Sequence, residues 1–157
     1  MDTTQDILKE LAKNKILFIT VYTWAITQTL KVLTGVVREK KFNFRWLIGT
    51  GGMPSSHAAT VSGMATAVGL SVGFDSAMFV VALVFAIIVI FDAQGVRRAS
   101  GKQAEVLNKM LDDIYWKKHI QEDRLKELLG HTPVEVLVGI ASGIIFALLL
   151  WRAYYGG

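Results

Sequence analysis

The sequence predicts an all-α fold: an integral membrane helical bundle with about four transmembrane helices and an amphipathic helical loop. Hydrophobic residues make up 52% of the 157 residues, which is high for a soluble protein that needs a charged surface. The apolar residues also gather into four long runs, which leave too little polar chain to cover them in water. We therefore expect a single membrane domain over residues 1–157, with spans at about 16–37, 57–73, 76–92 and 132–154.

A polar segment of mixed charge precedes the first span. Ile7, Leu8 and Leu11 recur in it at helical spacing, a pattern that fits an amphipathic helix on the membrane or a frayed terminus. The span at 16–37 contains polar residues that would be costly against lipid, so we expect one of its faces to point into the bundle. These polar residues are Thr20, Thr23, Thr27, Gln28 and Lys31.

The second predicted span, 57–73, is rich in Ala, Gly, Ser and Thr, which let membrane helices approach each other closely. A tight turn at 73–76 leads into the strongly apolar third span, 76–92. Both runs are slightly short for a bilayer, and a buried hairpin of a soluble protein would share their composition. We favour membrane spans because four such segments exceed what the polar chain can cover.

A polar helical insertion occupies about residues 99–130. Its leucines and isoleucines recur at roughly helical spacing among balanced charges. The pattern predicts one or two amphipathic helices on the membrane surface, and a solvated helical hairpin would share it. The last span, 132–154, closes on aromatic residues typical of a membrane interface.

The distribution of Lys and Arg sets the expected orientation. Four spans place both termini on one side, and the connections 36–57 and 92–131, which hold most of the Lys and Arg, on the other. By the positive-inside rule these connections face the cytoplasm. The formal charge of +4 is modest and its basic residues lie beside apolar runs, which favours the lipid bilayer over nucleic acid as the partner. The absence of cysteine excludes disulfides and thiol chemistry. The sequence leaves open whether the chain forms a homo-oligomer.

The stretch Gly51-Gly52-Met53-Pro54-Ser55-Ser56-His57 combines a glycine turn with the expected start of a helix. We expect Pro54 to preset φ at that start, with two serines and His57 in the first turn. The N–H groups of such a turn favour an anion, and histidine titrates near neutral pH. A glycine turn and a serine cap before a buried helix would have the same sequence.

Two histidines, His57 and His131, begin predicted spans on the same membrane face. Phosphoryl transfer uses such a combination: one imidazole attacks phosphorus, the other protonates the leaving oxygen, and cations with backbone amides hold the remaining oxygens. The basic residues at the ends of the other two spans on this face are Lys31, Arg38, Arg97 and Arg98.

Glu135 lies four residues after His131, so both side chains share one helical face. Its carboxylate could accept from the imidazole Nδ1–H and leave Nε2 nucleophilic. Thr132 and Glu135 also form a capping box with Pro133 at the first helical position. The sequence does not separate the capping interpretation from the catalytic one.

Three segments in order resemble the type 2 phosphatidic acid phosphatase superfamily, which includes vanadium-dependent haloperoxidases. Pro-Ser-Ser-His at 54–57 resembles its Pro-Ser-Gly-His motif, Gly-Val-Arg-Arg at 95–98 its arginine segment, and residues 131–139 the end of its third motif. Lys31 and Arg38 have the spacing of its first motif. From about residue 28 to 143 the chain is most similar to the divergent bacterial and plant branch of that superfamily.

The chain departs from the superfamily pattern at several positions. Ser56 stands where glycine is usual, Glu135 where aspartate is usual, and Glu39 where proline would follow the first arginine. A polar segment of more than thirty residues separates the arginines from His131, and the superfamily usually has six spans.

The resemblance implies a metal-independent phosphatase without a cofactor, in a bacterial cell membrane, acting on phosphatidic acid, phosphatidylglycerophosphate or an isoprenyl diphosphate. His131 would be the nucleophile that forms a phosphohistidine, oriented by Glu135, and His57 the general acid and then the base for water. A non-catalytic protein that binds or transports phosphate-headed lipids is the alternative, and a structural membrane subunit is a weaker one. The phosphate-binding residues would be Lys31, Arg38, Ser55, Ser56, Arg97 and Arg98.

Overall fold

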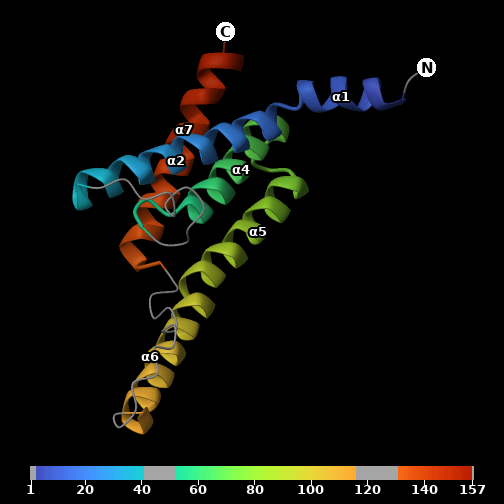
Figure 1. The fold of residues 1–157 in the computed structure, drawn as a ribbon. Helices are drawn as coiled ribbons and strands as arrows, with labels where there is room; N and C mark the ends of the chain where they lie inside the picture. Colours follow the sequence, from blue (N-terminus) through green and yellow to red (C-terminus); the bar gives the residue numbers. More distant parts are fainter. Residues whose placement is uncertain (1–2, 41–51, 116–130, 157) are drawn as a thin grey trace.

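The structure is a computed structural model that describes residues 3–40, 52–115 and 131–156, without the side chains of 38, 39, 96–100, 102 and 112–115. Every regular element in these ranges is an α-helix, which confirms the predicted fold class (Figure 1). The helices are α1 (Thr3–Lys13), α2 (Lys15–Glu39), α4 (Ser56–Val72), α5 (Ala77–Gln94), α6 (Val96–Tyr115) and α7 (Pro133–Tyr155).

Three helices of the described chain, α2, α5 and α7, are long and apolar enough to cross a membrane. Their bounds agree closely with three of the predicted spans. The fourth predicted span coincides with α4, which has 17 residues. At 1.5 Å per residue this is about 26 Å, slightly less than the roughly 30 Å of a bilayer's hydrocarbon core. The structure is thus a helical membrane bundle in which α4 is the shortest of the four packed helices.

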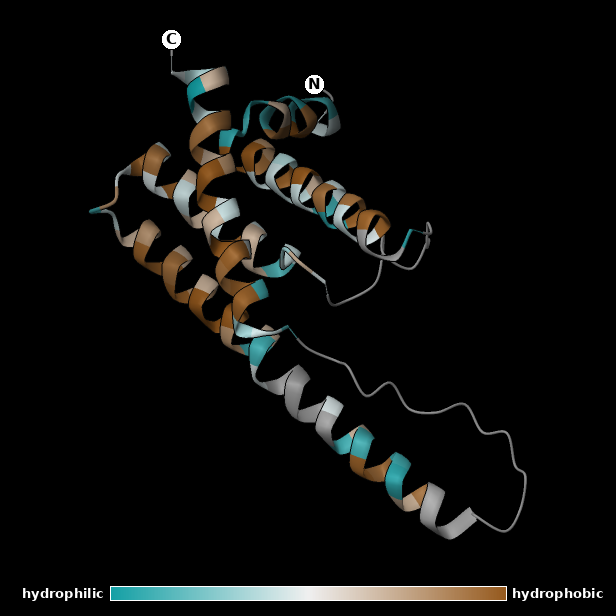
Figure 2. Ribbon diagram, turned by 90° about the vertical axis from the view of Figure 1, so that its left-hand side faces the viewer, coloured by the Kyte–Doolittle hydropathy of each residue, from teal (hydrophilic) through white to brown (hydrophobic). Residues whose placement is uncertain are grey.

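Helix α4 is the centre of the bundle and packs against α2, α5 and α7 (Figures 1 and 2). Its contact with α7 depends on glycines. A Cβ at Gly139 would lie 2.6 Å from the carbonyl oxygen of Ser55, and one at Gly143 would overlap the carbonyl oxygen of Ala59. The small residues therefore give the close helix approach that the composition predicts, and they hold the first turns of α4 and α7 side by side.

The polar face of α2 points into the bundle, as the sequence predicts. Thr23 and Thr27 are fully buried, and Lys31 is only 6% exposed. The hydroxyl of Thr27 donates to the carbonyl oxygen of Thr23 at 2.7 Å. These polar side chains are thereby shielded from lipid, where they would be costly.

Helix α6 confirms that the start of the predicted polar insertion is helical, while its place on the membrane surface stays a prediction. Gly95, between α5 and α6, has backbone angles in the right-handed helical region (φ −88°, ψ −67°), so the chain does not reverse its direction there. As a result α6 runs on roughly along α5 and extends away from the bundle (Figures 1 and 2). The rest of the predicted insertion, 116–130, lies outside the described residues.

Candidate functional site

Four helix ends meet at one end of the bundle: the end of α2, the start of α4, the end of α5 and the start of α7 (Figure 1). Two backbone hydrogen bonds join segments that are far apart in the sequence. The N–H of Ser55 donates to the carbonyl oxygen of Glu135 at 3.1 Å, and the N–H of His131 donates to that of Ala93 at 3.3 Å. The start of α7 is therefore fixed to both α4 and α5.

The start of α4 corrects the position predicted for Pro54. Ser55 is the N-cap, and its hydroxyl oxygen accepts from the N–H of Ala58 at 3.4 Å. The helix begins at Ser56, so Pro54 lies before the cap, after a cis peptide bond, and not in the first turn. The reason is that a serine hydroxyl can accept from an otherwise unsatisfied N–H of the first turn. His57 is in that turn, as predicted.

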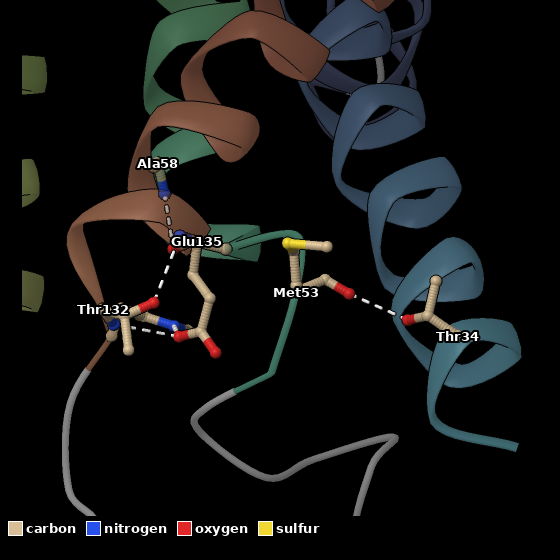
Figure 3. A network of polar contacts seen from close by, with 7 residues as sticks. Thr34, Met53, Ala58, Thr132 and Glu135 are labelled. Atoms are coloured by element: carbon tan, nitrogen blue, oxygen red, sulfur yellow. Dashed lines mark hydrogen bonds and ion pairs between the residues drawn. The ribbon is translucent and has the colours of Figure 1, made fainter. Parts of the chain in front are cut away.

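The chain before Pro54 lies against α2. Gly52 has a φ of +89°, a conformation that glycine adopts without strain, which confirms the predicted glycine turn there. Gly51 lies outside the described residues. A Cβ at Gly52 would be 3.4 Å from Cε of Lys31. The hydroxyl of Thr34 donates to the carbonyl oxygen of Met53 at 2.8 Å (Figure 3). The buried Lys31 is thus held beside the turn that leads into α4.

The structure brings His57 and His131 together. Their ring centroids are 6.0 Å apart and the ring planes are inclined by 59°. His131 is 2% exposed, while His57 is half-buried. The two imidazoles come from the starts of adjacent helices and are close enough to act on one small group.

Glu135 makes both of the contacts that the sequence offers as alternatives. Its carboxylate oxygen Oε2 accepts from the N–H of Thr132 at 3.0 Å, and the hydroxyl of Thr132 accepts from the N–H of Glu135 at 3.3 Å (Figure 3). This is the predicted capping box. The same Oε2 lies 3.2 Å from Nδ1 of His131. A proton on Nδ1 would leave Nε2 as the basic nitrogen of the ring.

Gln28, which the sequence placed on the polar face of the first span, also contacts the candidate site, a role that the sequence did not predict. The hydroxyl of Ser56 donates to Oε1 of Gln28 at 2.6 Å, which connects the first turn of α4 to α2. Local sequence patterns do not reveal a pairing over 28 positions. The available signal was its position three residues before Lys31, which places both polar side chains on neighbouring parts of one helix face.

The structure describes only some of the predicted phosphate-binding side chains. Lys31 is buried at the site end of α2. Ser55 is fully buried and caps α4, and Ser56 is buried against α2, so their contact with phosphate stays a prediction. The remaining predicted side chains, which lie outside the described part, are those of Arg38, Arg97 and Arg98.

The long polar segment between the arginines and His131 does not separate their backbones widely. Helix α6 begins at Val96, shortly after Ala93, whose carbonyl oxygen accepts from the N–H of His131. The arginine segment therefore follows directly on the helix end that contacts His131.

Comparison with known proteins agrees with the resemblance seen in the motifs. The family described as "Divergent PAP2 family" matches residues 12–146. The chain is 41% identical over 139 residues to the uncharacterized membrane protein YuiD of Bacillus subtilis (strain 168), and the alignment covers 82% of this chain and 87% of the relative. No solved structure matches the chain.

Proposed function

Because this chain belongs to the Divergent PAP2 family, and because two histidines meet at one end of its membrane bundle, we propose that it is a lipid-phosphate phosphatase. The proposed reaction is metal-independent hydrolysis of a phosphomonoester or diphosphate of a membrane lipid. The observation that carries the proposal is the contact of Nδ1 of His131 with Glu135 beside a second imidazole. The ring centroids of His131 and His57 are 6.0 Å apart. A histidine oriented by a carboxylate beside a second acid–base group is the arrangement that nucleophilic catalysis needs.

In the proposed first step, Nε2 of His131 attacks the phosphorus atom of a phosphomonoester. The N–P bond forms as the bond from phosphorus to the ester oxygen breaks. Protonated His57 gives its proton to the leaving alkoxide, and the lipid alcohol departs. Glu135 stabilises the charge that develops on the His131 ring, while Lys31 and the N–H groups at the start of α4 attract the phosphate oxygens.

In the proposed second step, water hydrolyses the phosphohistidine. Neutral His57 takes a proton from the water as its oxygen attacks phosphorus. The N–P bond breaks, inorganic phosphate leaves, and His57 is again protonated for the next turnover. One histidine thus serves as acid and then as base, which needs a pKa near the working pH.

The test of the proposed function is phosphate release by the purified full-length protein from a panel of lipid phosphates, with and without EDTA. We expect release from phosphatidic acid or phosphatidylglycerophosphate in mixed micelles, at the same rate with and without the chelator. Binding of these lipids without release would favour the alternative, a protein that binds or transports phosphate-headed lipids. Such a protein needs the cation and the backbone amides but has no use for two imidazoles in different positions.

Replacing Glu135 separates its capping role from its role at His131. Glu135→Gln keeps an oxygen that can accept from the N–H of Thr132, so we expect little change in melting temperature. It removes the negative charge beside His131, so we expect phosphate release to fall by between about 10-fold and about 10⁴-fold. Thermal unfolding in detergent and the release assay measure the two effects.

The matched control for this substitution is Thr132→Ala. It removes the hydroxyl that accepts from the N–H of Glu135 but leaves the carboxylate beside His131. We expect a loss of stability of about 1 kcal/mol with near-normal release. A fully active Glu135→Gln variant of normal stability would leave Glu135 as a helix cap alone.

We also propose that the two-histidine end of the bundle faces the cytoplasm, because the connections at that end hold most of the Lys and Arg. This orientation favours glycerophospholipid substrates over a lipid diphosphate recycled outside the cell. The chain has no cysteine, so single-cysteine variants test the orientation directly. Gln103→Cys on α6 should resist an impermeant thiol reagent in intact cells, while Thr3→Cys on α1 should react. The reverse pattern would contradict the orientation.

A further inference from the structure

Helix α1 stands apart from the packed bundle. None of its residues is buried within the described chain, and it extends sideways from the start of α2 (Figure 1). Its largest apolar side chains, Ile7, Leu8 and Leu11, are 52%, 60% and 47% exposed. A helix that presents such residues without a partner among the described residues needs another apolar environment to cover them.

The apolar and charged residues of α1 lie on opposite faces. Ile7, Leu8 and Leu11 follow the i, i+1, i+4 spacing of one helix face. Lys9 and Lys13 project on the other face, where Lys9 forms an ion pair with Asp6 at 3.7 Å. Asp6 and Glu10 balance the two lysines, so the charge of the helix gives it no general attraction to an anionic surface. What α1 offers to a partner is its apolar stripe.

The position of α1 along the bundle identifies the environment that the stripe meets. A single residue, Asn14, separates α1 from α2, and its side chain caps α2 by accepting from the N–H of Leu17 at 3.0 Å. The candidate membrane span begins at the next residue, Lys15. Lys15 Nζ lies 4.6 Å from the ring centroid of Tyr155 and 5.5 Å from that of Trp151, on the last turns of α7. Trp, Tyr and Lys gather at the level of lipid headgroups, so the last turn of α1 lies near that level.

We propose that α1 lies in the plane of the lipid–water interface, at the end of the bundle opposite the two histidines, with Ile7, Leu8 and Leu11 in the acyl region. The occupant of the stripe is the bilayer itself. Because the helix charge is balanced, the insertion is apolar in origin and needs no anionic lipid. The proposal concerns a different end of the molecule and does not depend on the phosphatase activity.

Single nitroxide labels test the proposal in the full chain, which is naturally free of cysteine. The variants Leu8→Cys, Leu11→Cys, Lys9→Cys and Lys13→Cys are labelled and reconstituted in zwitterionic phosphatidylcholine vesicles. Collision of each label with oxygen, which concentrates in the acyl region, and with a water-soluble nickel chelate is measured by electron paramagnetic resonance. Lys9 and Lys13 serve as matched positions on the opposite face of the same helix.

We expect the labels at positions 8 and 11 to collide several times more often with oxygen than with the nickel chelate, and those at 9 and 13 to show the opposite ratio. The pattern should persist in high salt. Equal collision with the nickel chelate at all four positions would show a helix in water and overturn the proposal. Protection of positions 8 and 11 from both reagents would also overturn it, since it would show that a second copy or another protein covers the stripe.

Discussion

His131→Ala is expected to abolish phosphate release and any covalent phosphoenzyme. The substitution removes the proposed nucleophile, which carries the phosphoryl group between the two steps of the proposed reaction. The loss should be on the order of 10⁴-fold or more, down to the background of the assay. The measurement is release of phosphate from the best lipid of the panel by purified, detergent-solubilised protein.

Two variants make this result interpretable. His131 is buried and contacts Glu135, so alanine removes packing as well as chemistry. His131→Asn keeps a polar side chain and the backbone N–H that donates to Ala93, and it should be equally inactive while retaining its thermal transition. His119, the third histidine in the chain, provides a matched substitution, and His119→Ala should remain active. Full activity of a folded His131→Ala protein would disprove the proposed mechanism.

His57→Ala is expected to reduce phosphate release from a lipid phosphomonoester by about 10²- to 10⁴-fold, the usual loss when a general acid is removed. Attack by His131 remains available, so a slow residual rate should persist. Melting temperature should change little, because His57 is half-buried and the cap of α4 is formed by Ser55.

The leaving group distinguishes an acid from a binding residue at position 57. A nitrophenyl phosphate releases a stable phenolate that needs no proton, so loss of His57 should matter less for the chemical step of this substrate. If both substrates slow by the same factor in His57→Ala, His57 acts in phosphate binding or in positioning rather than in protonation. The ratio of the two effects, measured at saturating substrate, is the observable.

The helices could be predicted because their signals are local. Long apolar runs set the lengths of α2, α5 and α7, and the sequence Thr-Pro-x-Glu at 132–135 predicted the capping box that begins α7. Burial of the polar face of α2 was also predicted, since Thr23, Thr27 and Lys31 would be costly in lipid. The prediction that Pro54 stands at the start of α4 was wrong, because Ser55, one residue later, caps the helix and Pro54 lies before the cap.

The arrangement of the site could be predicted only in part. Two histidines and a carboxylate at helix starts indicated the chemistry, but not that one oxygen of Glu135 would serve both the cap and His131. The contact of Ser56 with Gln28 joins residues that local periodicity does not relate. The direction of α6 depends on the helical backbone angles of Gly95. Glycine adopts many other backbone conformations equally well, so the sequence did not predict this direction.

The most direct test of the proposed mechanism is detection of the phosphorylated residue during turnover. The full-length protein is mixed with the lipid phosphate that it hydrolyses fastest, quenched with alkali within one turnover, and examined by peptide mass spectrometry. His57→Ala is treated in parallel with a nitrophenyl phosphate, because this substrate needs no acid to form the intermediate, while the loss of the base should slow its hydrolysis. We predict a phosphoryl group on His131 in both proteins and none in His131→Asn. Phosphate release at the normal rate without any adduct on His131, or with an adduct on another residue, would contradict the mechanism.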